Sequence, residues 1–367
     1  MRIIHCADVH LDSKISANLD EEKAKLRREE VLHTFIRMID YAEENHVQVI
    51  LIAGDLFDTR RVKASVRNAV EDVIRKHGSI RFYLLKGNHD ASGFLNALDS
   101  PPENLYLFDE NWTRYVLNPD TKGNVILTGA ELTCENRGLT DSLVLDYEAF
   151  NIVMLHGQQT NYAGKQVAET ISLADLKNKG IDYLALGHVH EYHEESLDKR
   201  GVWCYSGCLE GRGFDECGEH GFVLLEVDEE SHSFHHQFIP FAERRLHTVR
   251  VDVTGCDRTA RMLERVQDVL CGQDILPKDM VKLVLTGKVD VDCEKDAEQI
   301  AKAVADYYFF VKVSDETGFL VDYRRYLHDQ SLKGEFVRKV MESDMEEEQK
   351  AVIIRYGLQA LAGEEIE

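Results

Sequence analysis

Short apolar runs of strand length alternate with amphipathic stretches of helix length in the N-terminal part of the chain. Residues 2–7, 47–53 and 80–86 are the apolar runs. Between them, residues 21–45 and 64–77 repeat their apolar positions with the period of an α-helix. Runs without polar interruptions suit strands that are buried on both faces. This β-α-β-α-β series predicts a parallel sheet with right-handed crossover connections.

The middle of the chain adds further strand candidates and one short helix, at residues 172–179. Strands are predicted at residues 125–130, 151–155, 181–186, 202–205, 222–227 and 233–241. The last three candidates follow one another without a helix between them. They therefore predict an antiparallel meander at the end of one of two packed sheets.

The pattern changes near residues 241–246, where a second domain is expected to begin. Its strands are predicted at 248–253, 280–285 and 308–313, and its helices at 258–270 and 294–305. Farther on, residues 332–341 and 347–361 predict two amphipathic helices. We expect a first domain at 1–242, a smaller β/α domain at 246–322 and a helical segment at 323–367.

Five predicted strands are each followed directly by side chains that can bind metal ions. In α/β sheets, ligands bind at the carboxyl ends of the strands, so these side chains are expected to meet. Glycines such as Gly54 and Gly87 let the backbone turn sharply beneath them. In chain order, the candidate ligands are Asp8, His10, Asp55, Asn88, His156, His188 and His190.

This mixed set of oxygen and nitrogen ligands suits manganese, iron, cobalt, nickel or zinc. Seven ligands exceed what one ion needs, but they suit two ions that share a carboxylate. Two ions about 3.5–4 Å apart can clamp the attacking and leaving oxygens of a phosphoryl displacement. A single histidine or Gly-Asp after a strand is usually a surface residue or a turn. The ordered set at successive strand ends is what predicts a metal centre.

Composition narrows the function classes without deciding among them. The net charge of −23, taken alone, argues against a protein that coats nucleic acid by bulk attraction, but it does not exclude a nuclease, because bound cations can reverse the sign locally. No apolar run is long enough to cross a bilayer, and the N-terminus lacks a signal-peptide layout, so a cytoplasmic location is expected. The eight cysteines form no C-x-x-C pair and predict buried thiols. The spacing of Cys204, Cys208 and Cys217 matches no usual zinc pattern.

The motif order Asp-x-His, Gly-Asp-x-x-Asp, Gly-Asn-His-Asp, His-Gly and Gly-His-x-His resembles the calcineurin-like metallophosphoesterase superfamily. The resemblance implies an α/β fold, a four-layer α/β/β/α sandwich with two sheets between helices. It implies that one ion is held by Asp8, His10, Asp55 and His190. The other would be held by Asp55, Asn88, His156 and His188, with Asp55 as the bridge.

The resemblance also implies a catalytic role for His89, which is not a ligand in the family. His89 would face the substrate and stabilise or protonate the leaving oxygen. Asp58 is expected to orient it, as carboxylates commonly do for a catalytic histidine. Helix N-capping is the alternative role for Asp58, and the two roles can coexist.

Within the superfamily, residues 4–13, 54–58, 87–90 and 205–216 resemble the DNA-repair exonuclease group. This group includes the nuclease subunit of the bacterial SbcCD complex and YhaO-like relatives. The Gly-Asp-x-x-Asp-Arg-Gly motif of protein Ser/Thr phosphatases is not matched here, because Thr59 and Arg60 follow Asp58. The resemblance implies Mn²⁺ as the metal, although Fe, Co, Ni, Zn or Mg remain alternatives.

For this group, the resemblance further implies a DNA substrate, a capping domain that contacts DNA and an SMC-like ATPase partner that binds the C-terminal helices. It also implies a homodimer formed by helices of the first domain. Helices that pack only on their own domain would give the same pattern. Two other functions stay open: a phosphodiesterase that acts on nucleotides or other small phosphodiesters, and a non-catalytic adaptor for an ATPase. The complete ligand set argues against the adaptor, and the separate second domain argues against a small substrate.

Overall fold

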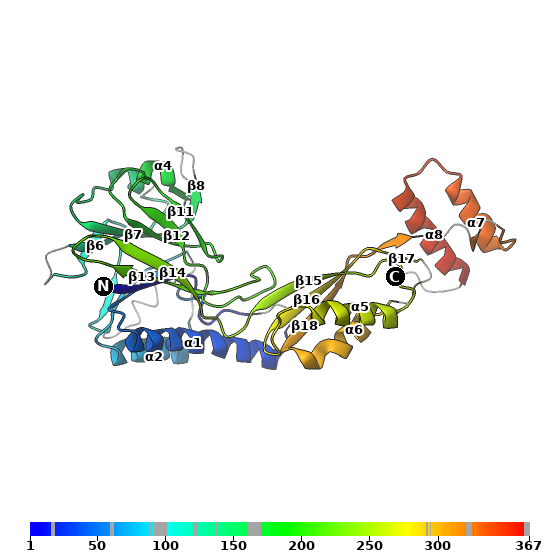
Figure 1. The fold of residues 1–367 in the computed structure, drawn as a ribbon, viewed down its shortest axis with the longest axis horizontal. Helices are drawn as coiled ribbons and strands as arrows, with labels where there is room; N and C mark the ends of the chain where they lie inside the picture. The colour runs from blue at the N-terminus through cyan, green and yellow to red at the C-terminus, as the bar shows by residue number, and fades with distance from the viewer. Residues whose placement is uncertain are drawn as a thin grey trace. The chain divides into compact units, whose positions relative to one another are not determined.

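The computed structural model divides the chain into two compact units, Met1–Arg245 and Leu246–Glu367 (Figure 1). The predicted functions of the three regions 1–242, 246–322 and 323–367 stay predictions. The residues that the structure describes are 1–15, 19–58, 62–88, 90, 101–119, 124–136, 138–160, 170–290, 293, 295–320, 325, 326 and 328–362.

The first sheet of the first unit has the strand order β14-β13-β1-β2-β3-β4. Its four parallel strands are β1 (Arg2–Cys6), β2 (Val49–Ala53), β3 (Arg81–Leu85) and β4 (Leu105–Leu107). The antiparallel strands β13 (Gly221–Val227) and β14 (Phe234–Pro240) extend it beyond β1. Every residue of β2 is buried, which agrees with the prediction of a strand covered on both faces.

The second sheet has the order β11-β12-β10-β7-β6-β5. These strands are β5 (Thr113–Val116), β6 (Val125–Gly129), β7 (Phe150–His156), β10 (Tyr183–Gly187), β11 (His193–Ser196) and β12 (Val202–Tyr205). The predicted meander was wrong at its first strand. β12 pairs in parallel with β10 in this sheet, while β13 crosses to the other sheet and pairs with β1. Two short strands, β8 (Gln158–Thr160) and β9 (Thr170–Ser172), pair separately.

Three buried clusters build the predicted four layers, and the α/β/β/α expectation is confirmed. Helices α1 (Glu21–Glu44) and α2 (Ala64–Lys76) pack on the outer face of the first sheet, through residues such as Phe35 and Val70. The two sheets pack face to face through a second cluster that includes Leu51 and Ile152. The short helices η1 (Leu139–Ser142) and α4 (Leu173–Leu176) lie with the outer face of the second sheet.

The second unit repeats the alternation that the sequence predicts. Its sheet contains the parallel strands β15 (Leu246–Asp252), β16 (Met280–Thr286) and β18 (Phe310–Asp315). Helices α5 (Thr259–Cys271) and α6 (Ala297–Val304), the latter followed by η2 (Ala305–Tyr307), share a core with one face of this sheet. Strand β17 (Lys288–Asp290) pairs with β19 (Gly318–Leu320).

The predicted C-terminal helices are also present, as α7 (Leu332–Met341) and α8 (Glu347–Ala362). They pack against each other through an apolar cluster that includes Val337 and Ile354. Among the described residues, no helix combines the length and the apolar composition needed to cross a lipid bilayer.

Helix α1 holds the loop after β12 through a buried ion pair. The side chains of Arg27 and Glu210 are 1% and 0% exposed, and Arg27 Nη2 lies 3.2 Å from Glu210 Oε2. Arg27 Nη2 also donates to the Gly211 carbonyl at 2.9 Å, and Thr34 Oγ1 donates to Glu210 Oε1 at 2.7 Å. These hydrogen bonds satisfy both charges inside the protein, which is the condition for tolerating a buried pair.

Replacement of Arg27 by methionine should therefore destabilise the first unit, because it leaves the Glu210 carboxylate buried without its cation. We expect Arg27→Met to lower the free energy of unfolding by about 3–5 kcal/mol in chemical denaturation. The matched control is Lys25→Met, two residues away on the same helix, where the side chain is 71% exposed and its Nζ lies 3.8 Å from Glu29 Oε1. That change should cost below about 1 kcal/mol. Equal losses in the two variants would contradict a stabilising role for Arg27.

Candidate metal centre

Five strand ends meet at one edge of the first unit, as the sequence predicts. The loop after β1 runs beside the loop after β2, where Asp8 N donates to Gly54 O at 3.0 Å and His10 N to Asp55 O at 2.9 Å. The ends of β7 and β10 are also joined, because Gly157 N donates to the Gly187 carbonyl at 3.1 Å. These hydrogen bonds join the loops through the backbone alone, without any side chain.

Four of the candidate ligands have unusual backbone conformations. Asp8, His10, Asp55 and His188 have φ angles of 50°, 50°, 51° and 106°. Residues other than glycine rarely adopt positive φ, and each such residue costs about 1–3 kcal/mol. Strain of this kind is retained mostly at functional sites. The clustering of four such residues among the predicted ligands therefore supports a functional role for these loops.

Glycines provide space beside two ligands. A Cβ atom on Gly54 would lie 2.1 Å from His156 Nδ1, and one on Gly87 would lie 2.2 Å from Asp55 Oδ1. Gly54 also has a φ of 94°, which L side chains rarely adopt. Any side chain at either position would displace a ligand.

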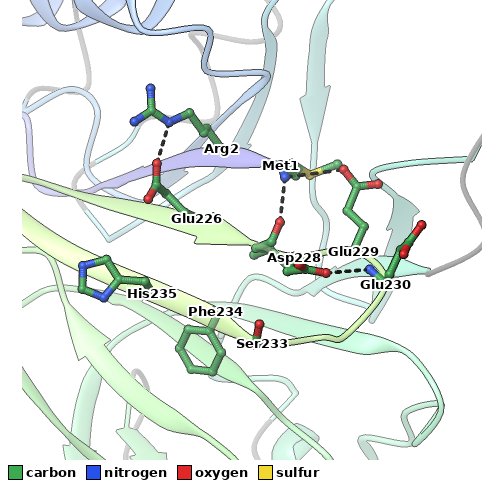
Figure 2. A pocket seen from close by; sticks show the side chains of 10 residues that line it. Met1, Arg2, Glu226, Asp228, Glu229, Glu230, Ser233, Phe234 and His235 are labelled. Carbon is green, nitrogen blue, oxygen red and sulfur yellow. Dashed lines mark hydrogen bonds and ion pairs between the residues drawn. The ribbon is translucent and has the colours of Figure 1, made fainter.

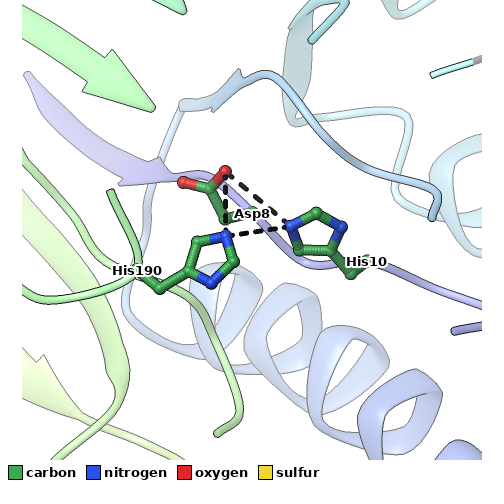
Figure 3. A group of neighbouring side chains, drawn as sticks. All are labelled: Asp8, His10 and His190. Atoms are coloured by element: carbon green, nitrogen blue, oxygen red, sulfur yellow. Dashed lines mark hydrogen bonds and ion pairs between the residues drawn. The ribbon is translucent and has the colours of Figure 1, made fainter. Parts of the chain in front are cut away.

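The first group of candidate ligands is Asp8, His10 and His190 (Figure 3). The Nε2 atoms of His10 and His190 lie 3.1 Å apart, and each is 3.9 Å from Asp8 Oδ1. Asp8 is only 1% exposed. Its oxygens accept hydrogen bonds from the backbone N–H of His188 at 2.9 and 3.1 Å. The three side chains therefore point toward one small volume.

Carboxylates fix which nitrogen of each imidazole carries the proton. Asp58 Oδ1 lies 3.1 Å from His10 Nδ1, and Glu216 Oε1 lies 2.6 Å from His190 Nδ1. An ionised carboxylate can only accept, so both Nδ1 atoms are the donors. Arg212 Nη2 also lies 3.2 Å from His190 Nδ1, but the shorter, charge-assisted contact with Glu216 determines the tautomer. The two Nε2 atoms then face each other 3.1 Å apart, so one cation, a proton or a metal ion, is favoured between them.

The pKa values of the two imidazoles shift in opposite directions. Burial lowers the pKa of His190, but Glu216 and Asp8 outweigh it and raise that pKa, so a positive charge is favoured on this ring. Burial lowers the pKa of His10, which keeps its imidazole neutral. Burial alone raises the pKa of Glu216, but the hydrogen bond from His190 and the charge of Arg212 lower it to about 2. The pKa of Asp58 is also lowered, because His10 and Arg212 outweigh its burial. Both orienting groups are therefore carboxylates at neutral pH.

The second group is Asp55, Asn88 and His156. His156 Nε2 lies 3.4 Å from Asp55 Oδ2 and 3.1 Å from Asn88 Oδ1, while its Nδ1 lies 2.9 Å from the Ala53 carbonyl. The carbonyl accepts from Nδ1, so Nε2 is the ring atom that faces the two oxygens. Burial lowers the pKa of His156, but Asp55 and Asp8 outweigh it and raise the pKa to about 9. A positive charge is therefore favoured at this position as well.

Asp55 and His188 link the two groups. Asp55 Oδ2 lies 3.8 Å from His10 Nε2 in the first group and 3.4 Å from His156 Nε2 in the second. This is the position predicted for the bridging carboxylate. The His188 ring is perpendicular to that of His156, with 5.4 Å between the centroids. The structure thus brings all seven predicted ligands into one place, although their roles toward metal ions stay predictions.

One of the two predicted catalytic residues can be located. Asp58 lies beside His10 and Arg212, as given above, and Arg212 Nη1 donates to Asp58 Oδ1 at 3.3 Å. His89 lies outside the described residues, so its expected pairing with Asp58 stays a prediction. Asp58 therefore has a contact that the sequence did not predict, to the ligand His10.

Asp90, Arg212 and Glu216 are three further residues of the site that sequence reasoning did not single out. Asp90 accepts hydrogen bonds from the backbone N–H groups of Leu56, Phe57 and Gly87, at 3.2, 2.8 and 3.0 Å. It therefore ties the loop after β2 to the loop after β3. Burial raises its pKa to about 6, against the effect of the three donors. The motifs contain all three residues, but spacing alone does not show which partner each one has.

Cys208 lies close to this network but has the properties of a packing residue. Cys208 forms a cluster with His190 and Glu216 in which potential ligand atoms lie within 4.8 Å of one another. Burial raises the pKa of its thiol well above the usual value. Its Sγ lies 3.2 Å from His220 Nδ1, and His220 Nε2 lies 2.9 Å from the Glu216 carbonyl. A protonated thiol that donates to His220 explains this geometry without a metal ion.

A pocket of about 760 Å³ lies where β1 begins and β13 ends, so it is at the other end of β1 from Asp8 (Figure 2). Arg2 Nε and Glu226 Oε1 pair across it at 2.7 Å. None of the predicted ligands lines this pocket. Its position separates it from the metal centre.

The sequence profile of the calcineurin-like phosphoesterases matches residues 1–192 of the chain. The chain is 29% identical to the uncharacterized metallophosphoesterase YhaO of Bacillus subtilis, over 73% of this chain and 67% of YhaO. It is also 29% identical to the DNA double-strand break repair protein Mre11 of Sulfolobus acidocaldarius, over 54% of this chain and 52% of that protein. A dimetal phosphatase from Danio rerio aligns structurally over 62% of this chain and 93% of its own, with a TM-score of 0.41 and 12% identity. The part of the chain that aligns with Mre11 of Sulfolobus acidocaldarius thus spans about half of the length of that protein.

Loss of the shared carboxylate should abolish metal binding at both groups. We expect isothermal titration calorimetry to show two Mn²⁺ ions per wild-type chain and none in Asp55→Ala, because one oxygen of Asp55 faces both groups. The matched control, Asp72→Ala, removes a carboxylate that is 80% exposed on α2 and should leave both ions in place. Undiminished binding by Asp55→Ala would refute the predicted bridge.

Proposed function

Because the chain belongs to the calcineurin-like phosphoesterase family, we propose that it is a two-metal phosphodiesterase that cleaves DNA. The observation that carries the proposal is the convergence of potential ligand atoms in two groups around one oxygen of Asp55. Such a set repels itself unless cations lie between its members. In this proposal, the first ion is held by Asp8, His10, Asp55 and His190, and the second by Asp55, Asn88, His156 and His188. Mn²⁺ is the preferred ion by family resemblance.

When bound, such ions supply Lewis-acid activation of water and of the phosphate. The chain's own residues perform the remaining tasks. Asp58 and Glu216 hold the protons on Nδ1 of His10 and His190, so that both Nε2 atoms remain acceptors. The backbone N–H of His188 fixes the Asp8 carboxylate. His89 is proposed to protonate the leaving oxygen, with Asp58 as its orienting carboxylate.

Two observations favour DNA over a small phosphodiester. The relatives named Mre11 are DNA double-strand break repair proteins. In the second unit, Thr248, Lys282 and Lys312 lie in register across three neighbouring strands. They alternate with the residues that pack on α5 and α6, so they lie on the opposite face of the sheet. Lysine and threonine side chains are common phosphate contacts in protein–DNA complexes.

An SMC-like ATPase is the proposed partner of the C-terminal helices. Val352, Ile353 and Tyr356 on α8 are 43%, 37% and 37% exposed. Their spacing places them together on the helix, away from Ala351, Ile354 and Leu358, which pack on α7. An exposed apolar strip on a helix suits a coiled-coil partner. A homodimer formed by helices of the first unit stays a prediction.

The substrate proposal can be tested with purified chain and Mn²⁺. We expect degradation of linear duplex DNA in addition to hydrolysis of bis-p-nitrophenyl phosphate. His89→Ala should lose at least about 100-fold in rate on DNA because a general acid is missing, and it should still bind two Mn²⁺ ions. Asp72→Ala serves again as the control with unchanged rate. Hydrolysis of the small diester alone would favour the rival function, and full activity of His89→Ala would refute its catalytic role.

The partner proposal predicts a localised effect of charge on α8. An aspartate at Ile353 or Tyr356 should prevent co-purification of an SMC-type ATPase, because the apolar strip would become charged. The same substitution at the exposed polar residue Gln349 of α8 should not. Cleavage of DNA by the isolated chain should be equal in all three variants. Retention of the ATPase by Ile353→Asp would place the contact elsewhere.

A further inference from the structure

Two carboxylates hold the histidines of the first group from different loops. Asp58 follows β2, and Glu216 follows β12. Their oxygens lie 3.1 Å from His10 Nδ1 and 2.6 Å from His190 Nδ1. The orientation of both imidazoles, and hence the direction of both Nε2 lone pairs, depends on where these two carboxylates are held. Carboxylates that accept from a metal-bound histidine typically change metal affinity 10- to 100-fold when lost.

One guanidinium joins the two carboxylates. Arg212 Nη1 donates to Asp58 Oδ1 at 3.3 Å, and Nη2 donates to Glu216 Oε1 at 3.1 Å. The backbone N–H of Arg212 donates to the other oxygen of Glu216 at 2.7 Å. The oxygens that accept from the guanidinium are the same ones that lie beside the Nδ1 atoms of the two imidazoles. A continuous series of contacts therefore runs from His10 through Asp58, Arg212 and Glu216 to His190.

We infer that Arg212 is a positioning residue that sets the affinity of the first ion by fixing both orienting carboxylates at once. The inference rests on the proposed two-metal function. The planar guanidinium presents several N–H donors in a rigid fork, so it can bind two carboxylates in a defined relative geometry. A lysine ammonium has the same charge but no fork, and it cannot reproduce both contacts. The side chain of Arg212 is 20% exposed, so water only partly screens its ion pairs with Asp58 and Glu216.

Charge and geometry predict opposite effects of Arg212 on the cation site. A positive charge near the site repels a bound cation, so electrostatics alone predicts tighter metal binding when Arg212 is removed. Positioning predicts weaker binding, because Asp58 and Glu216 would no longer be held and the two imidazoles could rotate. The direction of the change therefore distinguishes the two roles.

The test is calorimetric titration of the full chain with Mn²⁺, comparing wild type with Arg212→Met and Arg212→Lys. We expect both variants to weaken one of the two Mn²⁺ sites about tenfold and to leave the other unchanged. The spin-coupled Mn²⁺ pair in electron paramagnetic resonance should then need correspondingly more Mn²⁺ to form. The matched control is Arg37→Met, which removes another arginine–carboxylate pair of the same unit, with Glu243 at 3.1 Å.

Each outcome decides the inference. Selective weakening of one site in both variants supports it, and Arg212→Lys alone suffices if Arg212→Met does not fold. Wild-type affinity in Arg212→Lys, or equal or tighter binding in Arg212→Met, would overturn it in favour of a charge effect. Equal weakening of both sites would overturn it in favour of general loosening. A wild-type chain that binds no Mn²⁺ would instead overturn the proposed function, and this inference with it.

Discussion

The metal centre depends on the close approach of electron-rich nitrogen and oxygen atoms from several side chains. The surrounding fold must hold these atoms together. His10 and His190 direct their Nε2 atoms at each other across 3.1 Å, beside the buried carboxylate of Asp8. His156 faces two oxygens in the same way. Without a cation, these contacts are repulsive, so the scaffold must hold the groups in place. The raised pKa of His156 has the same origin, because the nearby carboxylates of Asp55 and Asp8 favour a positive charge on this ring.

The scaffold meets this demand with parallel strands and short backbone links. The fully buried strands β2, β7 and β10 bring their carboxyl ends to one edge. Hydrogen bonds from Asp8 N and His10 N to the loop after β2, and from three N–H groups to Asp90, then join the loops. Positive φ angles at Asp8, His10 and Asp55 aim the side chains inward. The strain at these residues is tolerated because each one is held by several neighbours.

The sequence predicts the ligand set because its logic is local. A polar residue directly after an apolar strand must lie at the carboxyl edge, and parallel strands share that edge. The contacts that hold the two orienting carboxylates follow no such rule. Asp58 and Arg212 are 154 residues apart and meet only because the loops after β2 and β12 fold toward each other. The sequence did not predict that β13 joins the other sheet after β12, for a similar reason. An apolar run shows that a strand is buried, but it does not show which sheet the strand joins.

The same contacts explain how an acidic chain can carry a cation site with an arginine at its edge. The carboxylates Asp58 and Glu216 pair with the guanidinium and so offset its positive charge beside the imidazoles. Metal binding that occurs only in the folded state stabilises that state, by about 2.7 kcal/mol when the ion is present at 100 times its dissociation constant. This gain is of the same order as the strain of one or two left-handed residues. Cation binding therefore offsets part of the strain that these loops carry.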